Sequence, residues 1–477
     1  MALPFKPQSL DPGKNGNGGQ NIVHWLGYEP LIHMNADGSF SPGLATEWEY
    51  IGEGNTAFEM TIRTDALFSD GTPVTAQSVA DTINHYLANP GPLSHFLYGI
   101  TAAAVKDDET VAIELDQPNP ELPLVFSQAV NWGNVISPAG LEDPQKLTTE
   151  MFGAGPYVMN VAETVDNDRY TFDRNENYWN ADAVTYDRIV VRVIPDANAS
   201  LQALQTGQIQ FTMNGTGQLS DQAVSGGAEV VTGQGYVNSV FLMDRSGELL
   251  PPLGDLRVRQ ALNYAVDREA IATALGGGYV ATEQIAPEGT DAFDASLDST
   301  YGYDPELAKE LLAEAGYPDG FEMTLLTAQV TDLDTVAQAV AAQLEEVGVK
   351  VELKDVGVDI NQLIADMATK EWASVTWNMG GDMFANALQN FSSPSSPLNP
   401  FASSGEEVMG PWQDLLVSSQ DEKVANAKAL NRAVTENAWF IPVVQTPVFF
   451  FSKGIDDVGV VGPGAVMDIL DWKPAEG

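Results

Sequence analysis

The sequence predicts an α/β protein with more than one domain. The chain has 477 residues, which is more than a single hydrophobic core normally organises. Its composition, 44% hydrophobic and 18% charged residues, is that of a globular protein rather than a disordered one. Residues 321–353 show a strand, a helix and a strand joined by short links, and this pattern predicts two parallel strands with a right-handed crossover.

The first half of the chain contains a sequence typical of a strand, a tight turn and a capped helix. Apolar and polar residues alternate over residues 58–63, which is the period of a half-buried strand. Residues 69–73, SDGTP, are turn residues. Thr75 suits the N-cap of a helix that carries apolar residues on one face as far as residue 87. This stretch holds no nucleophile, base or ligand cluster, so we interpret it as architectural.

The remaining expected elements follow from the same two periods, 2 for strands and 3.6 for helices. Helix starts are indicated by capping residues such as Asp304 before Pro305, and helix ends by glycines such as Gly276-Gly277-Gly278. The expected elements are a strand at 109–115, a helix at 197–206, a strand at 209–213, a single helix at 256–275, a helix from 305 to Gly316, a strand at 321–327, a helix at 336–347, a strand at 349–353, a helix at 360–370 and a strand at 373–377.

The charge of the chain is strongly negative. Lys and Arg number 22 against 66 Asp and Glu, a formal net charge of −44. Such a chain repels nucleic acids and anionic lipids, so nucleic-acid binding is not expected. Two interpretations remain: a solvated acidic surface that suits a salty medium, or attraction of a cationic ligand.

Cysteine usage and apolar runs restrict the other possibilities. The chain has no cysteine, which excludes disulfides, thiolate metal sites and cysteine nucleophiles. No apolar run reaches the length of a membrane span. The start, Met1 to Phe5, shows no basic segment followed by an apolar stretch. We therefore expect either a cytosolic protein or an exported one whose signal precedes this sequence.

Catalytic and cofactor motifs are not found. The four histidines have no HExxH spacing, and no GxSxG, SxxK or Walker motif occurs. The string from Gly276 to Ala281 fits GxGxxA, but it follows an expected helix instead of a strand, so it does not indicate a dinucleotide site. We expect no catalytic residue, no metal site and no cofactor.

Five segments in order, and the tail of the chain, resemble one protein family. They are YEPLIHMNADGSFSPGLATEWEY (28–50), FSDGTPVTAQSVADTI (68–83), GAGPYVM with FDRNENYWN (153–180), DLRVRQALNYAVDREAI (255–271), YDPELAKELLAEAGYPDG (303–320) and FIPVVQTPVFFF (440–451). Together they resemble the extracellular solute-binding proteins of bacterial ATP-binding-cassette (ABC) importers, in the peptide/nickel-binding family.

The resemblance implies a two-lobed periplasmic-binding-protein-like fold of the large, dipeptide-binding-protein-like type, with an extra subdomain inserted in the first lobe. The expected first lobe comprises residues 1–44, 151–245 and 448–477. The inserted subdomain is expected at 45–150 and the second lobe at 246–447, with hinge crossings near 238–250 and 443–451. The resemblance also implies an exported protein, periplasmic or lipid-anchored, that works as a monomer with a membrane permease.

The resemblance also points to residues that contact the solute. In the family, a Trp followed by an acidic residue and Asp-Pro contributes ligand contacts, and an Asp there pairs with the amino terminus of a peptide. The corresponding run here begins at Trp377; it lacks the Asp-Pro and is one residue shorter. Asp382 is either the partner of an ammonium group or a turn or cap residue. The expected contacts from this run are Trp377, Asn378, Asp382 and Phe384.

Further candidates come from the kind of surface that solutes favour, aromatic walls with a few polar groups. They are Trp25, His95, Tyr98, Trp132 and Gln445. For the tryptophans the alternative is simple core packing, which is the usual role of large aromatic residues.

The function expected from the sequence is capture of an oligopeptide or related amino-bearing solute between two lobes, for delivery to a permease. An oligosaccharide or other polyhydroxylated solute is the alternative, since nine tryptophans offer faces for sugar rings. Alternatives of another class are a secreted hydrolase and a chemosensory receptor that does not serve transport.

Overall fold

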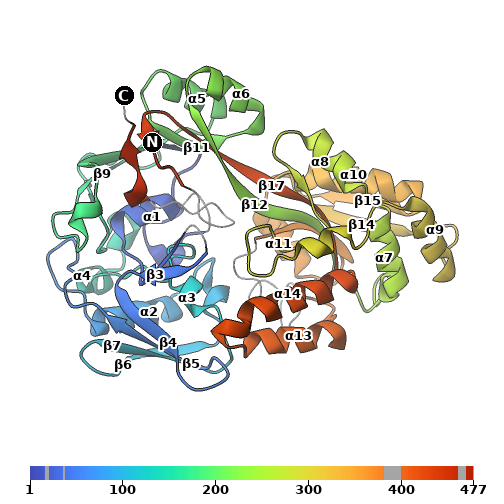
Figure 1. The fold of residues 1–477 in the computed structure, drawn as a ribbon, viewed down its shortest axis with the longest axis horizontal. Helices are drawn as coiled ribbons and strands as arrows, with labels where there is room; N and C mark the ends of the chain where they lie inside the picture. The colour runs from blue at the N-terminus through green and yellow to red at the C-terminus, as the bar shows by residue number, and fades with distance from the viewer. Residues whose placement is uncertain (17–20, 36–37, 381–398, 460–468, 476–477) are drawn as a thin grey trace. The chain divides into compact units, whose positions relative to one another are not determined.

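The computed structural model describes residues 1–16, 21–35, 38–380, 399–459 and 469–475. The chain divides into two compact units (Figure 1). Unit 1 comprises Met1–Gly233 and Val448–Gly477, and unit 2 comprises Gln234–Pro447. The chain passes from one unit to the other within two long strands, β12 (Glu229–Leu242) and β17 (Phe440–Ser452). The boundaries of the inserted subdomain stay a prediction.

Unit 1 contains a mixed sheet and a separate antiparallel sheet of four strands. The mixed sheet has the order β17-β11-β1-β10-β9-β8, and the antiparallel sheet has the order β4-β5-β7-β6. The strands are β1 (Ala2–Leu3), β2 (Ile32–Met34), β3 (Phe40–Pro42), β4 (Ala45–Tyr50), β5 (Ala57–Ile62), β6 (Ile100–Val105), β7 (Thr110–Leu115), β8 (Tyr157–Met159), β9 (Arg169–Arg174), β10 (Arg188–Val193), β11 (Phe211–Gly215), β18 (Ile455–Asp456) and β19 (Lys473–Pro474). The helices are α1 (Ile22–Gly27), α2 (Ala76–Ala88), α3 (Leu122–Val125), α4 (Pro138–Glu142), α5 (Ala197–Gln205) and α6 (Gly217–Ser225).

The structure confirms the strand and the capped helix predicted in the first half of the chain. Along β5 the buried residues are Phe58, Met60 and Ile62, as the alternation predicts. α2 covers the buried face of β6 and β7. This helix begins with a capping box: the Thr75 hydroxyl accepts from the Ser78 backbone N–H at 3.2 Å, and the Ser78 hydroxyl accepts from that of Thr75 at 3.0 Å. Two of the N–H groups at the helix start are thereby satisfied.

Unit 2 is an α/β sheet in the order β15-β14-β16-β12-β17, with β13 paired to β17. Its buried core comes mainly from α7, α10 and the strands β12, β14 and β17. The strands not yet given are β13 (Val280–Ala281), β14 (Glu322–Thr327), β15 (Lys350–Asp355) and β16 (Ser374–Met379). The helices are α7 (Leu256–Tyr264), α8 (Arg268–Leu275), α9 (Pro305–Glu314), α10 (Leu333–Glu346), α11 (Ile360–Met367), α13 (Glu406–Leu416) and α14 (Gln420–Glu436).

The predicted strand–helix–strand unit is confirmed. β14 and β15 are parallel, in a register that pairs Glu322 with Lys350 and Thr327 with Asp355, and α10 connects them. β14 is also parallel to β16, which pairs Leu325 with Ser374. The α/β fold class is confirmed in the same way.

The single helix expected at 256–275 is wrong, because the structure has two helices, α7 and α8. The break lies before Asp267, whose carboxylate accepts from the Ala270 N–H at 2.9 Å and caps α8. Buried Arg268 donates to the carbonyl oxygens of Asn263 at 3.1 Å and Val266 at 3.2 Å. These bonds satisfy carbonyl groups that the end of α7 leaves without a helical partner.

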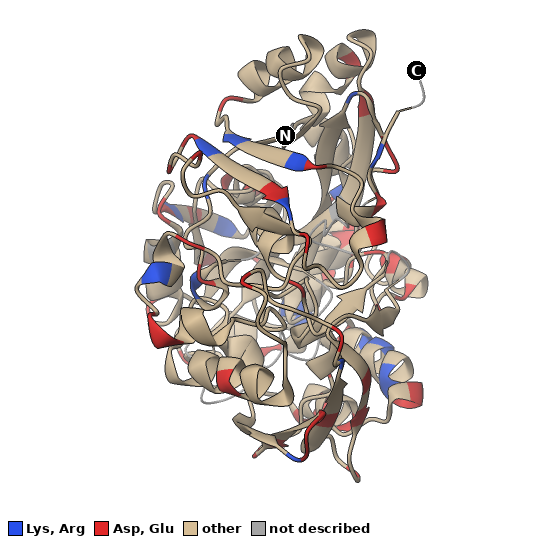
Figure 2. Cartoon of the chain, turned by 90° about the vertical axis from the view of Figure 1, so that its left-hand side faces the viewer, with Lys and Arg blue, Asp and Glu red and all other residues tan. Residues whose placement is uncertain are grey.

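Acidic residues occur on helices, strands and loops alike (Figure 2). Many of the basic residues are paired with them at the surface, as in the Lys106–Glu59 pair at 2.7 Å and the Arg188–Asp173 pair at 2.6 Å. With 66 acidic against 22 basic residues, most carboxylates must be balanced by cations from the solvent.

Candidate ligand-binding site

The topology of unit 2 places one sheet edge where ligands bind in this kind of fold. The chain runs from β14 to β15 on one side of β14 and then crosses to β16 on its other side. The direction in which strands are added to the sheet therefore reverses at β14. In open α/β sheets, ligands bind outside the carboxyl ends of the strands at such a switch point. The carboxyl end of β16 carries Trp377 and Asn378, and that of β14 leads into the turn Val330–Asp332 before α10.

The turn Val330–Asp332 is held by two asparagines that pair across β12 and β16, Asn238 and Asn378. Asn238 Nδ2 donates to the Thr331 carbonyl oxygen at 2.7 Å, and Asn378 Nδ2 donates to the Thr331 hydroxyl at 3.0 Å. Asn378, predicted from the family resemblance, therefore lies at the switch point. Asn238 is fully buried, at 0% exposed.

The backbone of this turn is strained. Thr331 has φ 47° and Asp332 has φ 62°, both in the left-handed region. A β-branched residue there is unusual, and such residues cost of the order of 1–3 kcal/mol each unless their surroundings impose the conformation. The surroundings here are the two asparagines and Tyr279, whose hydroxyl donates to the Asp332 carboxylate. Burial and the nearby Asp332 raise the pKa of Tyr279, so its hydroxyl stays a donor.

Trp377 is half-buried and alternates along β16 with Asn378, so it projects from the other face of the strand. Its neighbours on that face, Val375 and Met379, are buried. Gln445 on β17, another predicted residue of unit 2, is 3% exposed, and its side-chain oxygen accepts from the Glu288 N–H at 3.1 Å. Among the residues that the structure describes, its buried Nε2 has no partner.

In unit 1, Trp25 of α1 lines a small cavity of about 30 Å³, room for about one or two water molecules. Its indole N–H donates to the Gln128 carbonyl oxygen at 2.9 Å. Glu29 and His33 also line this cavity. The Glu29 carboxylate, 2% exposed, accepts from His33 Nε2 at 2.9 Å.

The Glu29 carboxylate has two further donors. The Tyr178 hydroxyl donates at 2.9 Å and the Trp179 indole N–H at 3.0 Å. The Arg63 guanidinium lies over the Trp179 ring, 3.2 Å from its centre. A buried carboxylate with three donors is structurally satisfied.

The other predicted residues of unit 1 are more closely tied to packing. Trp132 is 2% exposed, meets Tyr86 edge to face at 5.0 Å, and donates its N–H to the Leu93 carbonyl oxygen at 3.1 Å. Burial raises the pKa of Tyr98 well above its usual value. Its hydroxyl has no hydrogen-bond partner in the described part of the chain. His95 is exposed and contacts Phe96, with ring centres 4.0 Å apart. The structure does not bring Trp132, Tyr98 and His95 to the cavity beside Trp25.

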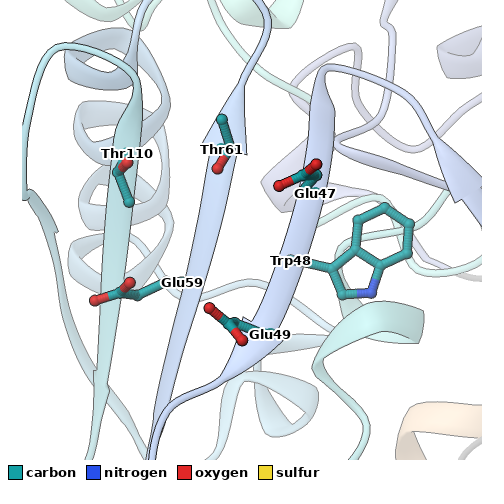
Figure 3. A pocket seen from close by; sticks show the side chains of 6 residues that line it. All are labelled: Glu47, Trp48, Glu49, Glu59, Thr61 and Thr110. Atoms are coloured by element: carbon teal, nitrogen blue, oxygen red, sulfur yellow. The ribbon is translucent and has the colours of Figure 1, made fainter.

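A larger hollow of about 370 Å³ lies on the four-stranded sheet. Figure 3 shows Glu47 and Glu49 on the same side of β4, with Glu59 on the neighbouring strand and Trp48 directed away from them. Glu49 lies directly opposite Glu59 in the strand register, and Glu59 pairs with Lys106. β4 is an edge strand, and charged residues on such strands prevent sheets from pairing edge to edge. We therefore assign these carboxylates to protection of the edge.

Two predicted contacts, Asp382 and Phe384, lie outside the described residues. Within the described ranges no group of three or more His, Asp or Glu residues has the geometry of a metal site. None of the described helices combines the length and the apolar character that crossing a membrane requires.

The predictions from sequence missed Asn238, Thr331 and Asp332. No motif marks Asn238, whose place depends on its pairing with Asn378 across two strands that are far apart in the chain. A signal did exist for Thr331 and Asp332, because they link a predicted strand to a predicted helix and so occupy the carboxyl edge of a parallel sheet.

Comparison with known proteins identifies the family. The family model for bacterial extracellular solute-binding proteins, family 5 (middle), matches residues 39–406. The glutathione-binding protein GsiB of Salmonella typhimurium is 29% identical over 369 residues, 76% of this chain and 70% of the relative. A probable peptide ABC transporter periplasmic-binding protein of Sinorhizobium fredii is 27% identical over 349 residues, 68% and 64% of the two chains.

The fold agrees with a solved structure. HbpA2 from Haemophilus parasuis superimposes with a TM-score of 0.86 at 20% identity, covering 100% of this chain and 99% of that one. At this low sequence identity, the structural similarity supports the two-lobed fold alone. Because the family model spans most of the sequence, the chain belongs to the bacterial extracellular solute-binding proteins of family 5, the peptide/nickel-binding type.

Proposed function

We propose that this protein is the solute receptor of an ABC importer and that it captures an oligopeptide or related amino-bearing solute without altering it. The observation that carries the proposal is the family match over residues 39–406. The names of two relatives, a glutathione-binding protein and a probable peptide-transporter protein, favour a peptide. In this proposal the protein works outside the cell membrane and hands its solute to a permease.

The position of Trp377 supports an aromatic wall for the solute. The side chain is half-buried, although its neighbours on the same face of β16 are buried. Aromatic side chains with one accessible face are common in solute sites. Asn378, the next residue, takes part in the contacts to Thr331 at the switch point.

A thermal-shift screen tests this proposal with mixtures of tripeptides and of oligosaccharides. A ligand that binds only the folded state stabilises it by about 2.7 kcal/mol at a hundred times its Kd. We expect the tripeptides to raise the melting temperature of the wild type. We also expect Trp377→Ala to remove this rise and to leave a folded protein.

The matched control is Trp372→Ala, because Trp372 is also half-buried and lies just before the same strand. This variant should respond to tripeptides as the wild type does. A response to oligosaccharides alone would contradict the peptide proposal. Hydrolysis of the peptides during the assay would contradict a receptor role, and an undiminished response of Trp377→Ala would remove Trp377 from the site.

A further inference from the structure

The two edge strands of the four-stranded sheet in unit 1 differ in charge. β4, at one edge, carries the carboxylates Glu47 and Glu49. In the part of the chain that the structure describes, β6 is the edge strand on the other side, and its sequence ITAAAV contains no charged residue and no proline. Edge strands present N–H and C=O groups that can pair with another chain, and charges or prolines commonly prevent this. β6 therefore needs another kind of protection.

The beginning of β6 is protected by its shape. The register between β6 and β7 shifts between Ile100 and Ala102, so the strand is irregular at Thr101. The Thr101 hydroxyl donates to the Glu114 carbonyl oxygen of β7 at 3.1 Å. Bulges of this kind twist an edge strand and disturb its further pairing. The regular stretch Ala102–Val105 remains as the part of the edge on which another strand could be added.

The side chain of Asn84, on α2, occupies the outer edge of this regular stretch. Its Nδ2 donates to the Ala103 carbonyl oxygen at 2.8 Å, and its Oδ1 accepts from the Ala103 backbone N–H at 3.1 Å. Two antiparallel strands exchange the same two N–H···O bonds at each hydrogen-bonded pair of residues. The Asn84 amide therefore takes the place that a residue of a further strand would have.

Helix formation and helix packing do not explain an asparagine at this position. Asn84 is exposed, and asparagine forms helices less readily than alanine or leucine. α2 already packs on the sheet through buried residues such as Val79, Ile83 and Tyr86. The two bonds to Ala103 are thus the distinctive contribution of this side chain.

The Asn84 amide is uncharged, which matters in a chain with a net charge of −44. At low ionic strength, repulsion between two such chains opposes their association. At about 1 M salt the screening length falls to about 3 Å, so this long-range repulsion is largely lost. Hydrogen bonds of a neutral amide do not depend on charge in this way. Asn84 therefore covers the edge in a salty medium as well as in a dilute one.

We propose that Asn84 prevents β6 from pairing with the β6 strand of a second copy of this chain. A two-fold axis perpendicular to the sheet would relate the two strands as an antiparallel pair. Three alanines and Val105 form the stretch, so pairing would bring two backbones together without placing carboxylates of β6 against each other. The inference concerns the state of association and goes beyond the proposed function, whose solute has no part in it.

Amide hydrogen exchange at about 0.05 M KCl tests whether Asn84 holds the edge. We expect the Ala103 amide to exchange at least tenfold faster in Asn84→Ala than in the wild type, because it loses its acceptor. The Ala112 amide, on the inner strand β7, should keep its rate and shows that the sheet is intact. The matched control is Gln77→Ala, which removes an exposed amide of the same helix whose Nε2 donates to Asp81 at 2.9 Å. It should leave both rates unchanged.

Sedimentation velocity at about 1 M KCl, over a series of protein concentrations, tests the second copy. We expect the wild type and Gln77→Ala to stay monomeric, and Asn84→Ala to associate at concentrations at least tenfold lower than either. The double variant Asn84→Ala/Ala104→Lys should return to the monomer. Ala104 is an exposed residue of β6, and a lysine on an edge strand opposes pairing by other means.

Four outcomes overturn the inference. An unchanged exchange rate of the Ala103 amide in Asn84→Ala shows that Asn84 does not hold the edge. Faster exchange of the Ala112 amide as well shows that Asn84 stabilises the whole sheet instead of covering its edge. Asn84→Ala that remains as monomeric as the wild type shows that the uncovered edge does not pair with a second copy. Equal association of Asn84→Ala and the double variant places the contact on another surface.

Discussion

At the scale of single residues, Glu29 is a charged residue that has a structural role. Its carboxylate is 2% exposed and accepts from His33, Tyr178 and Trp179, which come from two distant parts of the sequence. A buried charge is tolerated only when its hydrogen bonds are complete. Glu29 thereby connects the end of α1 to the segment after β9.

We predict that Glu29→Gln destabilises the protein. The amide offers one acceptor oxygen in place of two, so at least one buried donor loses its partner, at a cost of about 1–3 kcal/mol. The measurement is the free energy of unfolding in urea. Glu47→Gln on exposed β4 is the control, and it should change that free energy by less than about 0.5 kcal/mol. Equal values for the two variants would show that the Glu29 contacts contribute nothing.

The candidate site was predictable at the residues that the family pattern marks and not at their partners. Trp377 and Asn378 follow from a local run of sequence. Asn238 meets Asn378 only because β12 and β16 pair, and no local pattern encodes that register. Trp132 was predicted as a contact but is packed in the interior. An aromatic residue in a loop looks the same in the sequence whether it packs in a core or contacts a solute.

At the scale of elements, the sequence predicts best where periodicity and capping agree. α9 begins at the expected Pro305, with the Asp304 carboxylate accepting from the Leu307 N–H at 2.9 Å. α10 and its flanking strands likewise follow the predicted pattern. In each case the local preference and the tertiary burial favour the same structure.

The elements that differ from the prediction do so through tertiary contacts. The apolar positions of 256–275 keep a helical period, so the break between α7 and α8 leaves no mark in that period. The break depends on buried Arg268, which also donates to the Pro442 carbonyl oxygen of β17 at 2.7 Å. β11 begins at Phe211 rather than 209, where its pairing with Ser452 of β17 begins. Such long-range contacts are not encoded in a local window.

At the scale of the whole molecule, the dominant physical property is the charge of −44. We predict that the melting temperature rises as KCl increases from about 0.05 M to about 1 M, because the screening length falls from above 10 Å to about 3 Å. Screening weakens repulsion among carboxylates more than it weakens the few ion pairs. Scanning calorimetry measures this effect. A melting temperature that falls with KCl would mean that the ion pairs outweigh the repulsion.

The central claim is that the protein holds a small solute and releases it unchanged. The most direct measurement is native mass spectrometry of the purified protein, followed by denaturation and identification of what it releases. We predict one molecule of a peptide or amino-bearing compound per chain, which rebinds with the same mass after removal and readdition. A released compound that rebinds only after chemical conversion, or a protein that binds none of the peptides offered, would contradict the claim.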